Sequence, residues 1–395
     1  MTQVAPMTPS QPGIRPGSLL DGGWVVESLL RAGPTGVAFR CHQADDPSRR
    51  TVIKVFHDTY PDAWRRFQRE AHVLKRIRHP NLVQAETAQL RAKPPYLVLQ
   101  LREGPDLRTV LTQAGALPLL QALAIGRDLA GLLTHLHAQA IVHRDLQPAN
   151  IVLTPHGPLV VQLGIAPEEP YGVLTQPGTR LGDVQYAPPE WATPQSELPH
   201  QWDLYALGQT LEAMLTGEEP FAADASLPEA DRAVRLTKRK RATPFLDPGP
   251  RFPEPVRRLV RELTDVDATK RPSSAREVYQ RLRSLVAELG GDPELAAGPP
   301  PELDLTDTPA PSLDSPLRAM KPPPPTLVPM EARARPGEVV IVPTEPGDPP
   351  IPVPGSLEGS AVRVAPYVAV SMLVAAMLMG AGMASLLVAV LWFVA

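Results

Sequence analysis

The distribution of proline divides this chain of 395 residues into a part that can fold and a part that cannot. Between Pro293 and Pro354 lie 19 of the chain's 50 prolines, including the runs "KPPPPTLVP" and "PGDPPIPVP". A segment of this composition cannot build a packed core. We therefore predict a disordered Pro-rich linker over residues 291–360, a folded domain over residues 19–290, and a disordered N-terminus over residues 1–18.

The C-terminal segment, residues 364–395, contains no charged residue. A transmembrane helix needs about 20 apolar residues, so the segment predicts one membrane-spanning helix. Basic residues precede it and none follow it: Lys321, Arg333, Arg335 and Arg363. This asymmetry places the folded domain in the cytoplasm, on a single-pass inner-membrane protein anchored by its C-terminus. The N-terminus has no apolar run typical of a secretory signal, which agrees with that orientation.

Small residues follow one stripe of the predicted span. Ala376, Gly380 and Ala384 lie four apart, a spacing that allows two helices to approach closely. The same spacing arises by chance in an alanine-rich span. A homodimer through the transmembrane helix is therefore one reading, and a span without a partner is the other.

Charge and cysteine content exclude two classes of site. The formal net charge is -3, which argues against the extended basic surface that a nucleic-acid partner requires. Cys41 is the single cysteine, so the chain has neither an intramolecular disulfide nor a Cys-rich zinc site. We expect Cys41 to be an ordinary strand residue.

Residues 19–290 alternate short strand-like runs and then amphipathic helical runs, and chemical motifs occur within them in a fixed order. "LLRAGPTGVAFR" (29–40) predicts a strand, a glycine-containing turn and a strand, whose backbone amides could cover phosphates. Lys54 follows in the strand "TVIKVF", and Glu70 lies in the next predicted helix. A strand lysine held by a helix carboxylate can present its ammonium group to phosphates.

Further along, "HRDLQPAN" (143–150) carries a carboxylate, Asp145, and an amide, Asn150, on one loop. "YAPPEW", "WDLYALGQTLEAMLTGEEPF" and "KRPSSAREV" follow at intervals suited to a helical domain. Taken in this order, the motifs resemble the bacterial Ser/Thr-type protein kinase family over nearly all of residues 19–290. The resemblance implies an α+β, two-lobed protein-kinase-like fold, with a strand-rich lobe ending near Leu99, a hinge at 100–104 and a helical second lobe.

The resemblance also implies roles for single residues. ATP would be the cofactor, and the positions that match its binding residues are Gly33, Gly36, Ala38, Val52, Lys54, Glu70, Leu99, Gln100, Arg102 and Val152. Asp145 matches the catalytic base and Asn150 a magnesium ligand. Asp203 matches the aspartate that holds the catalytic loop from below. Glu190 and Arg271 match a buried ion pair at the end of the activation segment.

Several positions depart from the family pattern. Arg31 replaces the first glycine of the glycine-rich loop. Around adenine, Ala38 stands where the family usually has valine and Val52 stands where it usually has alanine, so the total side-chain volume is roughly kept. Gln162 stands where the family has the metal-binding aspartate, and Gln147 where it has the catalytic-loop lysine. Asp183 stands where the family has a threonine if "GDVQYAPPE" is aligned with the family motif at the end of the activation segment. The stretch "GTR" at 178–180 offers another alignment.

These departures favour a pseudokinase: a membrane-anchored protein that binds ATP with weak or absent Mg²⁺ and that regulates or scaffolds a protein partner. An amide is a poor magnesium ligand, and phosphoryl transfer depends on metal ions and lysines that neutralise phosphate charge. Asp145 would then be a vestigial base. The alternative is an active Ser/Thr protein kinase with atypical metal binding, and a third reading is a structural tether that binds no nucleotide.

Plainer readings exist for individual residues. Lys54 and Glu70 could form a structural ion pair instead of a phosphate clamp, although we favour the clamp. We expect His143 to be a core histidine, stacked with Leu163 and Leu74. Thr175 and Thr179 are the acceptors that could place a phosphate near Arg144. Two groups of charges are expected to be solvated faces: Glu168 and Glu169, and the "KRKR" run at 238–241, whose alternative role is contact with anionic lipid or an acidic partner.

Overall fold

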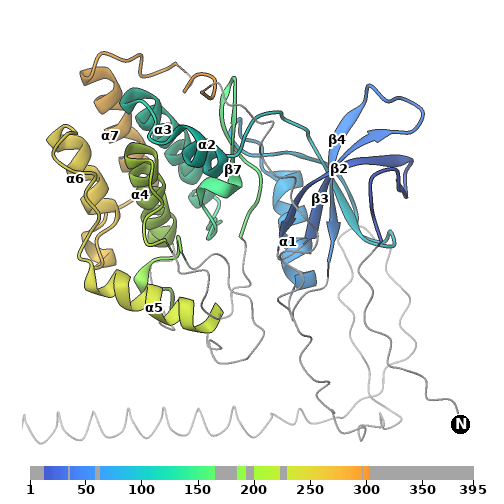
Figure 1. Cartoon of the computed structure of the whole chain (residues 1–395), viewed down its shortest axis with the longest axis horizontal. Coiled ribbons are helices and arrows are strands. Elements are labelled where there is room, and N and C mark those ends of the chain that lie inside the picture. Colours follow the sequence, from blue (N-terminus) through green and yellow to red (C-terminus); the bar gives the residue numbers. More distant parts are fainter. Residues whose placement is uncertain are drawn as a thin grey trace, which may run out of the picture. The chain divides into compact units, whose positions relative to one another are not determined.

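The computed structural model describes residues 13–33, 36–57, 63–164, 185–192, 200–222, 229–295 and 297–301. All of them belong to one compact unit, Met1–Thr326. A β-sheet with one helix forms one side of this unit and a group of helices forms the other (Figure 1). The predicted α+β, two-lobed architecture is therefore confirmed for the described part of the chain.

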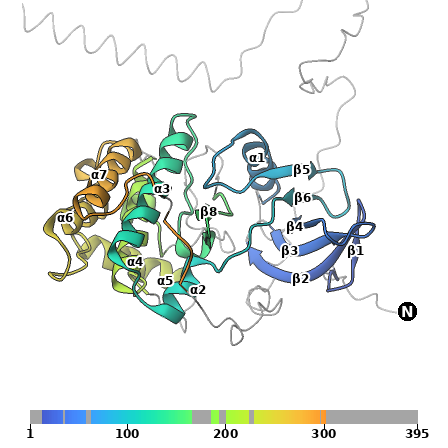
Figure 2. The same cartoon turned by 90° about the horizontal axis from the view of Figure 1, so that it is seen from above.

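The N-terminal lobe is a twisted antiparallel sheet covered by one helix. Its strands are β1 (Leu19–Leu20), β2 (Trp24–Gly33), β3 (Gly36–Gln43), β4 (Arg50–Phe56), β5 (Ala85–Gln89) and β6 (Tyr96–Leu99). They are ordered β1-β2-β3-β4-β6-β5, and helix α1 (Ala63–Arg76) lies against β5 (Figure 2). The sheet therefore presents one face to α1 and the opposite face to a separate apolar cluster.

Alternation along β4 decides where Lys54 points. Ile53 and Val55 are buried in the cluster on the outer face, together with Cys41 of β3. Val52 and Phe56 pack toward the main core, which includes α1. Because successive strand side chains point to opposite faces, Lys54 shares the inner face with Val52. Cys41 is thus the buried strand residue that we expected, and burial raises its pKa to about 12.

The C-terminal lobe is built around two central helices. Its elements are α2 (Leu107–Ala114), α3 (Leu119–His137), β7 (Ile151–Thr154), β8 (Gly157–Val160), α4 (His200–Thr216), α5 (Glu229–Ala242), α6 (Glu254–Leu263) and α7 (Ala275–Glu288), with 3-10 turns at Pro148–Asn150, Pro189–Ala192 and Ala268–Lys270. α3 packs against both α4 and α7 (Figure 1). α4 is buried along almost its whole length, as a helix that is apolar on most sides must be.

The packed part of the chain continues past residue 290. The buried guanidinium of Arg127 in α3 donates to the carbonyl oxygens of Pro293 and Leu295, each at 2.7 Å, and the Gln121 amide donates to Pro299 O at 2.9 Å. Residues 302–360 of the predicted linker and the predicted span at 364–395 lie outside the described residues. Among the residues that are described, no helix is both long enough and apolar enough to cross a bilayer.

The "KRKR" run lies in the last turns of α5, and the expectation of a solvated face is wrong for one of its members. Lys238, Arg239 and Arg241 are exposed, whereas Lys240 is 1% exposed. The Lys240 ammonium donates to Gln185 O at 2.7 Å and also to the carbonyl oxygen of Ala187. Lys240 lies four residues after the buried Leu236, so both share the helix face that packs inward.

Candidate active site

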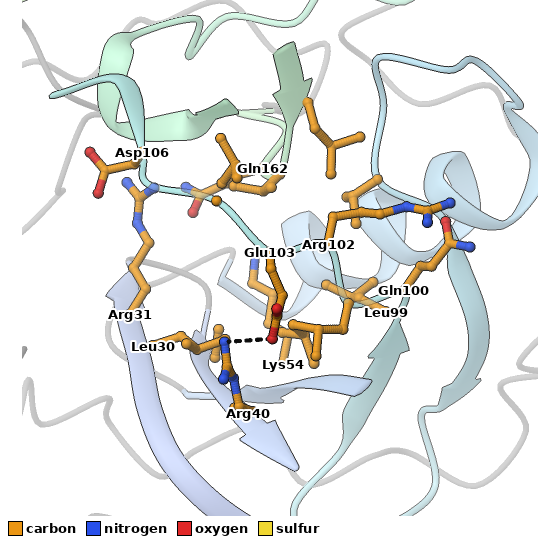
Figure 3. Close-up of a pocket in the computed structure, with 18 of the residues that line it drawn as sticks. Leu30, Arg31, Arg40, Lys54, Leu99, Gln100, Arg102, Glu103, Asp106 and Gln162 are labelled. Atoms are coloured by element: carbon orange, nitrogen blue, oxygen red, sulfur yellow. Dashed lines mark ion pairs between the residues drawn. The ribbon is translucent and has the colours of Figure 1, made fainter. Parts of the chain in front are cut away.

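A cavity of about 330 Å³ lies between the two lobes (Figure 3). Its walls come from β2, β3, β4, the segment that follows β6, the start of α2, β7 and the residues after β8. Most residues that the sequence predicted for nucleotide binding line it: Gly33, Gly36, Ala38, Val52, Lys54, Leu99, Gln100, Arg102 and Val152. Gln162 lines it as well, and Glu70 reaches it through Lys54.

Apolar side chains from both lobes line one part of the cavity, the apolar slot. Ala38 of β3 and Val52 of β4 lie on neighbouring strands, and Val52 is paired with Leu99 of β6. Val152 of β7 closes the slot from the other lobe. The exchange of volume between Ala38 and Val52 is therefore accommodated locally, and a planar apolar ring has room between the two lobes.

Gly104 fixes the segment that joins the lobes. Its φ is +155°, and a Cβ at this position would lie 2.0 Å from Leu153 O. Only glycine allows the connecting segment to approach β7 this closely. On the same segment Glu103 pairs with Arg40 of β3 at 3.5 Å, which ties the connection to the sheet (Figure 3).

Lys54 and Glu70 form a close, buried ion pair. The Lys54 ammonium donates to both carboxylate oxygens of Glu70, at 2.8 and 2.7 Å, and the two residues are 5% and 1% exposed. Two buried charges are retained at such a site only when they satisfy each other, because each alone would carry a large desolvation cost. The pair joins β4 to α1 and leaves Lys54 at the inner wall of the cavity.

Asp203 of α4 holds the loop that contains "HRDLQPAN". Its carboxylate accepts the backbone amides of His143 and Arg144, each at 2.8 Å, and the side chain of His137 at 2.8 Å. Burial alone would raise the pKa of Asp203, but these hydrogen bonds and the nearby histidines outweigh it and hold the pKa below its ordinary value. The anchoring also supports Arg144 in a left-handed conformation, with φ 63°.

His143 is the core histidine that we expected. It is 0% exposed, and Leu163 and Leu74 are buried in the adjoining core. Burial is the main cause that lowers the pKa of His143 to about 4. Its Nδ1 accepts the Asp145 amide at 3.2 Å, so the neutral ring shapes the loop and does not face the cavity.

Asp145 is surrounded by amide donors. Gln147 Nε2 donates to Oδ1 at 2.6 Å, Asn150 Nδ2 donates to Oδ2 at 2.7 Å, and Gln162 Nε2 donates to Oδ2 at 3.3 Å. Both replaced positions, Gln147 and Gln162, therefore turn their NH₂ groups toward this carboxylate. Each oxygen of Asp145 accepts at least one amide hydrogen.

The donor set fits a magnesium ion poorly. Asn150 Oδ1 is buried and makes no hydrogen bond, so one hard oxygen is positioned for a cation. The neighbouring Asp145 carboxylate is engaged by amides, and Gln162 brings no charge. Among the described residues, no group of three His, Cys, Asp or Glu side chains could hold a metal ion. A site based on carboxylates would require Gln147 and Gln162 to rotate away from Asp145.

Arg31 has a place in the site that its sequence position did not reveal. Its guanidinium crosses the cavity from β2 and donates to the carbonyl oxygen of Ala149, directly before Asn150 (Figure 3). The sequence showed only that a cation replaces a glycine there. The direction of the side chain depends on a register shift in β2, which no local sequence signal predicts.

Arg108 is a second residue that the sequence analysis missed. In α2 it donates to Glu219 at 2.6 Å and to Gln147 Oε1 at 3.3 Å, and Glu219 also accepts from Gln185. These contacts orient the Gln147 amide so that its NH₂ group faces Asp145. A pairing between residues so far apart in the chain has no local signal.

The ion pair predicted between Glu190 and Arg271 is present. Arg271 donates to the two carboxylate oxygens at 2.6 and 2.9 Å and also to Gln201 O at 3.1 Å. Its guanidinium lies over the Tyr205 ring at 4.8 Å. Other predicted positions lie outside the described residues: Glu168, Glu169, Thr175, Thr179 and Asp183.

Comparison with known proteins agrees with this architecture. Residues 24–282 match the family described as "Protein kinase domain". The chain is 32% identical over 331 residues to the probable serine/threonine-protein kinase PkwA of Thermomonospora curvata. The aligned region covers 80% of this chain and 41% of that relative. It is 29% identical over 268 residues to the serine/threonine-protein kinase PknA of Mycobacterium tuberculosis, covering 66% of this chain and 59% of the relative.

A third relative, the serine/threonine-protein kinase PkaA of Streptomyces coelicolor, is 29% identical over 286 residues, or 68% of this chain and 50% of the relative. The chain thus matches between two fifths and three fifths of the length of these relatives. The family match covers more than half of the chain and includes both lobes, the cavity between them and the loop held by Asp203. This chain belongs to the protein kinase domain family, and its relatives are kinases of the bacterial Ser/Thr type.

Proposed function

We propose that this chain is a pseudokinase, which binds ATP and regulates or scaffolds a protein partner while its phosphoryl transfer is lost or strongly reduced. The observation that carries the proposal is the set of amides around Asp145, with Gln162 at the position of the metal-binding carboxylate. Protein kinase domains use ATP and act on proteins in general, so both the nucleotide and a protein partner follow from the family.

The charges at the site explain why transfer would be weak. Phosphoryl transfer relies on positioning and on cations that neutralise the phosphate oxygens in the transition state. This site lacks one carboxylate for a metal ion and one lysine on the catalytic loop. Loss of one such electrostatic contact typically slows an enzyme by about 100- to 1000-fold. Two losses at one site would bring turnover close to background.

The nucleotide-binding half of the cavity supports the other part of the proposal. The slot is lined by the apolar side chains of Ala38, Val52, Leu99 and Val152, which suit the adenine ring of ATP. Lys54 is held at its inner wall by Glu70, in position to contact phosphates. In a tether that binds no nucleotide, this pair would serve only to join α1 to β4.

The direct test is transfer of radiolabelled γ-phosphate from ATP to the chain itself and to generic protein substrates, with Mg²⁺ or Mn²⁺. We expect the wild type to be indistinguishable from the Asp145→Ala variant. Millimolar ATP should nevertheless raise the midpoint temperature of thermal unfolding in both proteins. Asp145 forms hydrogen bonds with amides and is not one of the residues that line the nucleotide slot. Transfer by the wild type that disappears in Asp145→Ala would overturn the proposal.

An active Ser/Thr protein kinase with atypical metal binding is the second candidate. Two observations favour it: the Lys54–Glu70 pair is formed, and Asn150 Oδ1 is buried without a hydrogen-bond partner next to Asp145. Under this alternative, transfer would require the Asn150 oxygen. Transfer that falls more than tenfold in Asn150→Asp or Asn150→Ala, at saturating metal, would support it.

For the remainder of the chain we propose a single-pass membrane anchor. The support is the charge-free segment 364–395, preceded by basic residues and by the Pro-rich linker. The protein would lie at the inner membrane with its kinase domain in the cytoplasm. Deletion of residues 364–395 should move the protein from the alkali-washed membrane fraction to the supernatant, and a protein that stays in the membrane would contradict the proposal.

The stripe of small residues in the proposed span suggests self-association. A homodimer would place Ala376, Gly380 and Ala384 at the helix contact. Gly380→Leu should then reduce cross-linking of the full chain in membranes, whereas Leu378→Ala, on the opposite face of the proposed helix, should not. Equal cross-linking of both variants would exclude this contact.

A further inference from the structure

The outer side of α5 is rich in basic residues. Figure 1 shows α5 at the edge of the group of helices, and the buried Leu236 and Lys240 fix its inward side. The exposed side carries four basic residues: Arg235, Lys238, Arg239 and Arg241. Asp231 is the one acidic residue among the exposed positions that the structure describes on this helix. At about 100° per residue, the cations share one arc of α5, opposite the arc that is buried.

Three of these cations, which we call the basic stripe, have no ionic partner. In the part of the chain that the structure describes, Arg235, Lys238 and Arg241 form neither an ion pair nor a side-chain hydrogen bond. Arg239 differs, because its guanidinium donates to Ala222 O at 3.2 Å. The basic stripe can therefore bind an anionic surface without breaking a contact within the domain.

Surface arginines of the next two helices are paired with carboxylates. Arg257 of α6 pairs with Asp247 at 2.8 Å, and Arg281 of α7 pairs with Glu262. The row of unpaired cations is therefore particular to α5 and is not the general character of this lobe's surface. Because the whole chain has a formal net charge of -3, the stripe is also a local excess of positive charge.

Exposed apolar side chains accompany the basic stripe. Val234 is 69% exposed and lies between Lys238 and Arg241 around the helix. Phe245, three residues after the end of α5, is 40% exposed. Basic residues with interspersed apolar side chains suit the headgroup region of an anionic bilayer, where cations meet lipid phosphates and apolar groups enter the acyl boundary. An acidic protein would need a matching apolar recess for Val234, whereas a bilayer accepts such a side chain anywhere on its surface.

The strength of such a contact suits a domain that is already held near a membrane. Each basic residue close to an anionic bilayer increases binding about fivefold, so the three residues of the stripe would increase it about 100-fold. This gain is small for a protein free in solution. It becomes effective when the proposed anchor at 364–395 keeps the domain within reach of the lipid.

We infer that the basic stripe of α5 binds the anionic lipid headgroups of the membrane, so that the kinase domain contacts the bilayer through its C-terminal lobe. The inference rests on the proposed anchor, which supplies proximity. It goes beyond the proposed function because it gives the domain an orientation at the membrane and uses no residue of the cavity.

Quenching of a fluorophore on α5 by nitroxide-labelled lipids tests this contact in the full chain. Ala242→Cys places the fluorophore on the exposed side of α5, and Ser284→Cys places it on the exposed side of α7 as a reference. The native Cys41 is fully buried and stays unlabelled. The vesicles contain phosphatidylcholine alone or phosphatidylcholine with phosphatidylserine.

We expect the α5 fluorophore to be quenched only in vesicles with phosphatidylserine, and the α7 fluorophore in neither. Salt at about 1 M should remove the quenching, because it shortens the screening length to about 3 Å. The triple variant Arg235→Gln, Lys238→Gln and Arg241→Gln should also lose it, since the ratio of bound to unbound domain would fall about 100-fold. A control triple variant, Lys75→Gln, Arg76→Gln and Arg276→Gln, removes the same charge from exposed positions of α1 and α7 and should behave like the wild type.

Quenching that does not depend on phosphatidylserine, or that is equal in the two triple variants, would overturn the inference. So would a fluorophore that responds to polyglutamate and not to phosphatidylserine, since the stripe would then fit an acidic protein. Alkali extraction of the same vesicles reports the anchor separately. A chain that is retained but not quenched would have the anchor without the contact, and a chain that is extracted yet quenched would have the contact without the anchor.

Discussion

Lys54 and Asp145 belong to the same site but have opposite surroundings. Lys54 has a charged partner, Glu70, at 2.7 Å, whereas Asp145 is held by neutral amides of Gln147, Asn150 and Gln162. The first arrangement keeps a cation ready for phosphates. The second uses a carboxylate to organise a loop. At the scale of single residues, the site therefore combines a lysine fixed at the cavity wall by a carboxylate with an aspartate whose oxygens accept hydrogen bonds from side-chain amides.

Glu212 in α4 is a buried carboxyl group whose Oε2 has no hydrogen-bond partner. Burial, followed by the charge of Asp247, raises its pKa from 4.5 to about 7. The stability that this group contributes is present below pH 4.5 and is lost as the pH rises through 7, because the folded chain binds the proton more tightly. The free energy of unfolding of Glu212→Gln, taken relative to that of the wild type, should therefore increase by about 1–3 kcal/mol when the pH is raised from 5 to 8.

Urea unfolding of the wild type and Glu212→Gln at pH 5 and pH 8 checks this expectation. The exposed Glu254→Gln variant of α6 is the matched control and should show no such gain. A difference between the wild type and Glu212→Gln that is the same at both pH values would show that Glu212 does not titrate in this range.

At the scale of elements, α5 is attached to the rest of the lobe through Lys240. The buried ammonium satisfies two backbone carbonyls of the segment at 185–187 and lies 5.8 Å from the Tyr205 ring. Lys240→Met keeps the length of the side chain and leaves the Gln185 and Ala187 carbonyls without this donor. We expect a loss of about 1–3 kcal/mol in the free energy of unfolding, measured in urea.

Lys238→Met provides the control for that measurement, since Lys238 lies on the exposed side of the same helix. It should change the free energy of unfolding by less than about 0.5 kcal/mol. If both substitutions had equally small effects, the buried ammonium would contribute nothing to the attachment of α5.

The contrast between α5 and the other elements shows what the sequence could predict. The order of the motifs predicted the Lys54–Glu70 pair, and the resemblance to the bacterial Ser/Thr kinases implied the anchoring by Asp203 and the Glu190–Arg271 pair. The burial of Lys240 and the reach of Arg31 depend on how a helix is rotated and on one bulge in β2. The orientation of the amides around Asp145 depends on contacts such as Arg108 with Gln147, between distant elements.

At the scale of the whole molecule, distant segments are joined by buried polar contacts. Arg271, directly after the 3-10 turn Ala268–Lys270, pairs with Glu190, and Arg127 in α3 holds the chain at Pro293 and Leu295. Because the Arg271 side chain is fully buried, Arg271→Met would leave the Glu190 carboxylate without its charge partner. We expect a loss of about 3–5 kcal/mol in the free energy of unfolding, seen as a lower midpoint in urea.

An exposed ion pair of the same type gives the comparison for Arg271. Arg283 pairs with Glu294, and both side chains are more than half exposed. Arg283→Met should therefore cost no more than about 1 kcal/mol. Should Arg271→Met unfold at the same urea concentration as Arg283→Met, the buried pair would not be a structural connection of this lobe.

In the proposed pseudokinase, the missing carboxylate at position 162 limits phosphoryl transfer. The most direct measurement is the initial rate of γ-phosphate transfer from ATP, with Mg²⁺, by the wild type, Gln162→Asp and Gln162→Asp combined with Asp145→Ala. We expect a rate in Gln162→Asp more than tenfold above the wild type and a return to background in the double variant. A wild-type rate that already exceeds the Asp145→Ala background, with no gain in Gln162→Asp, would contradict it.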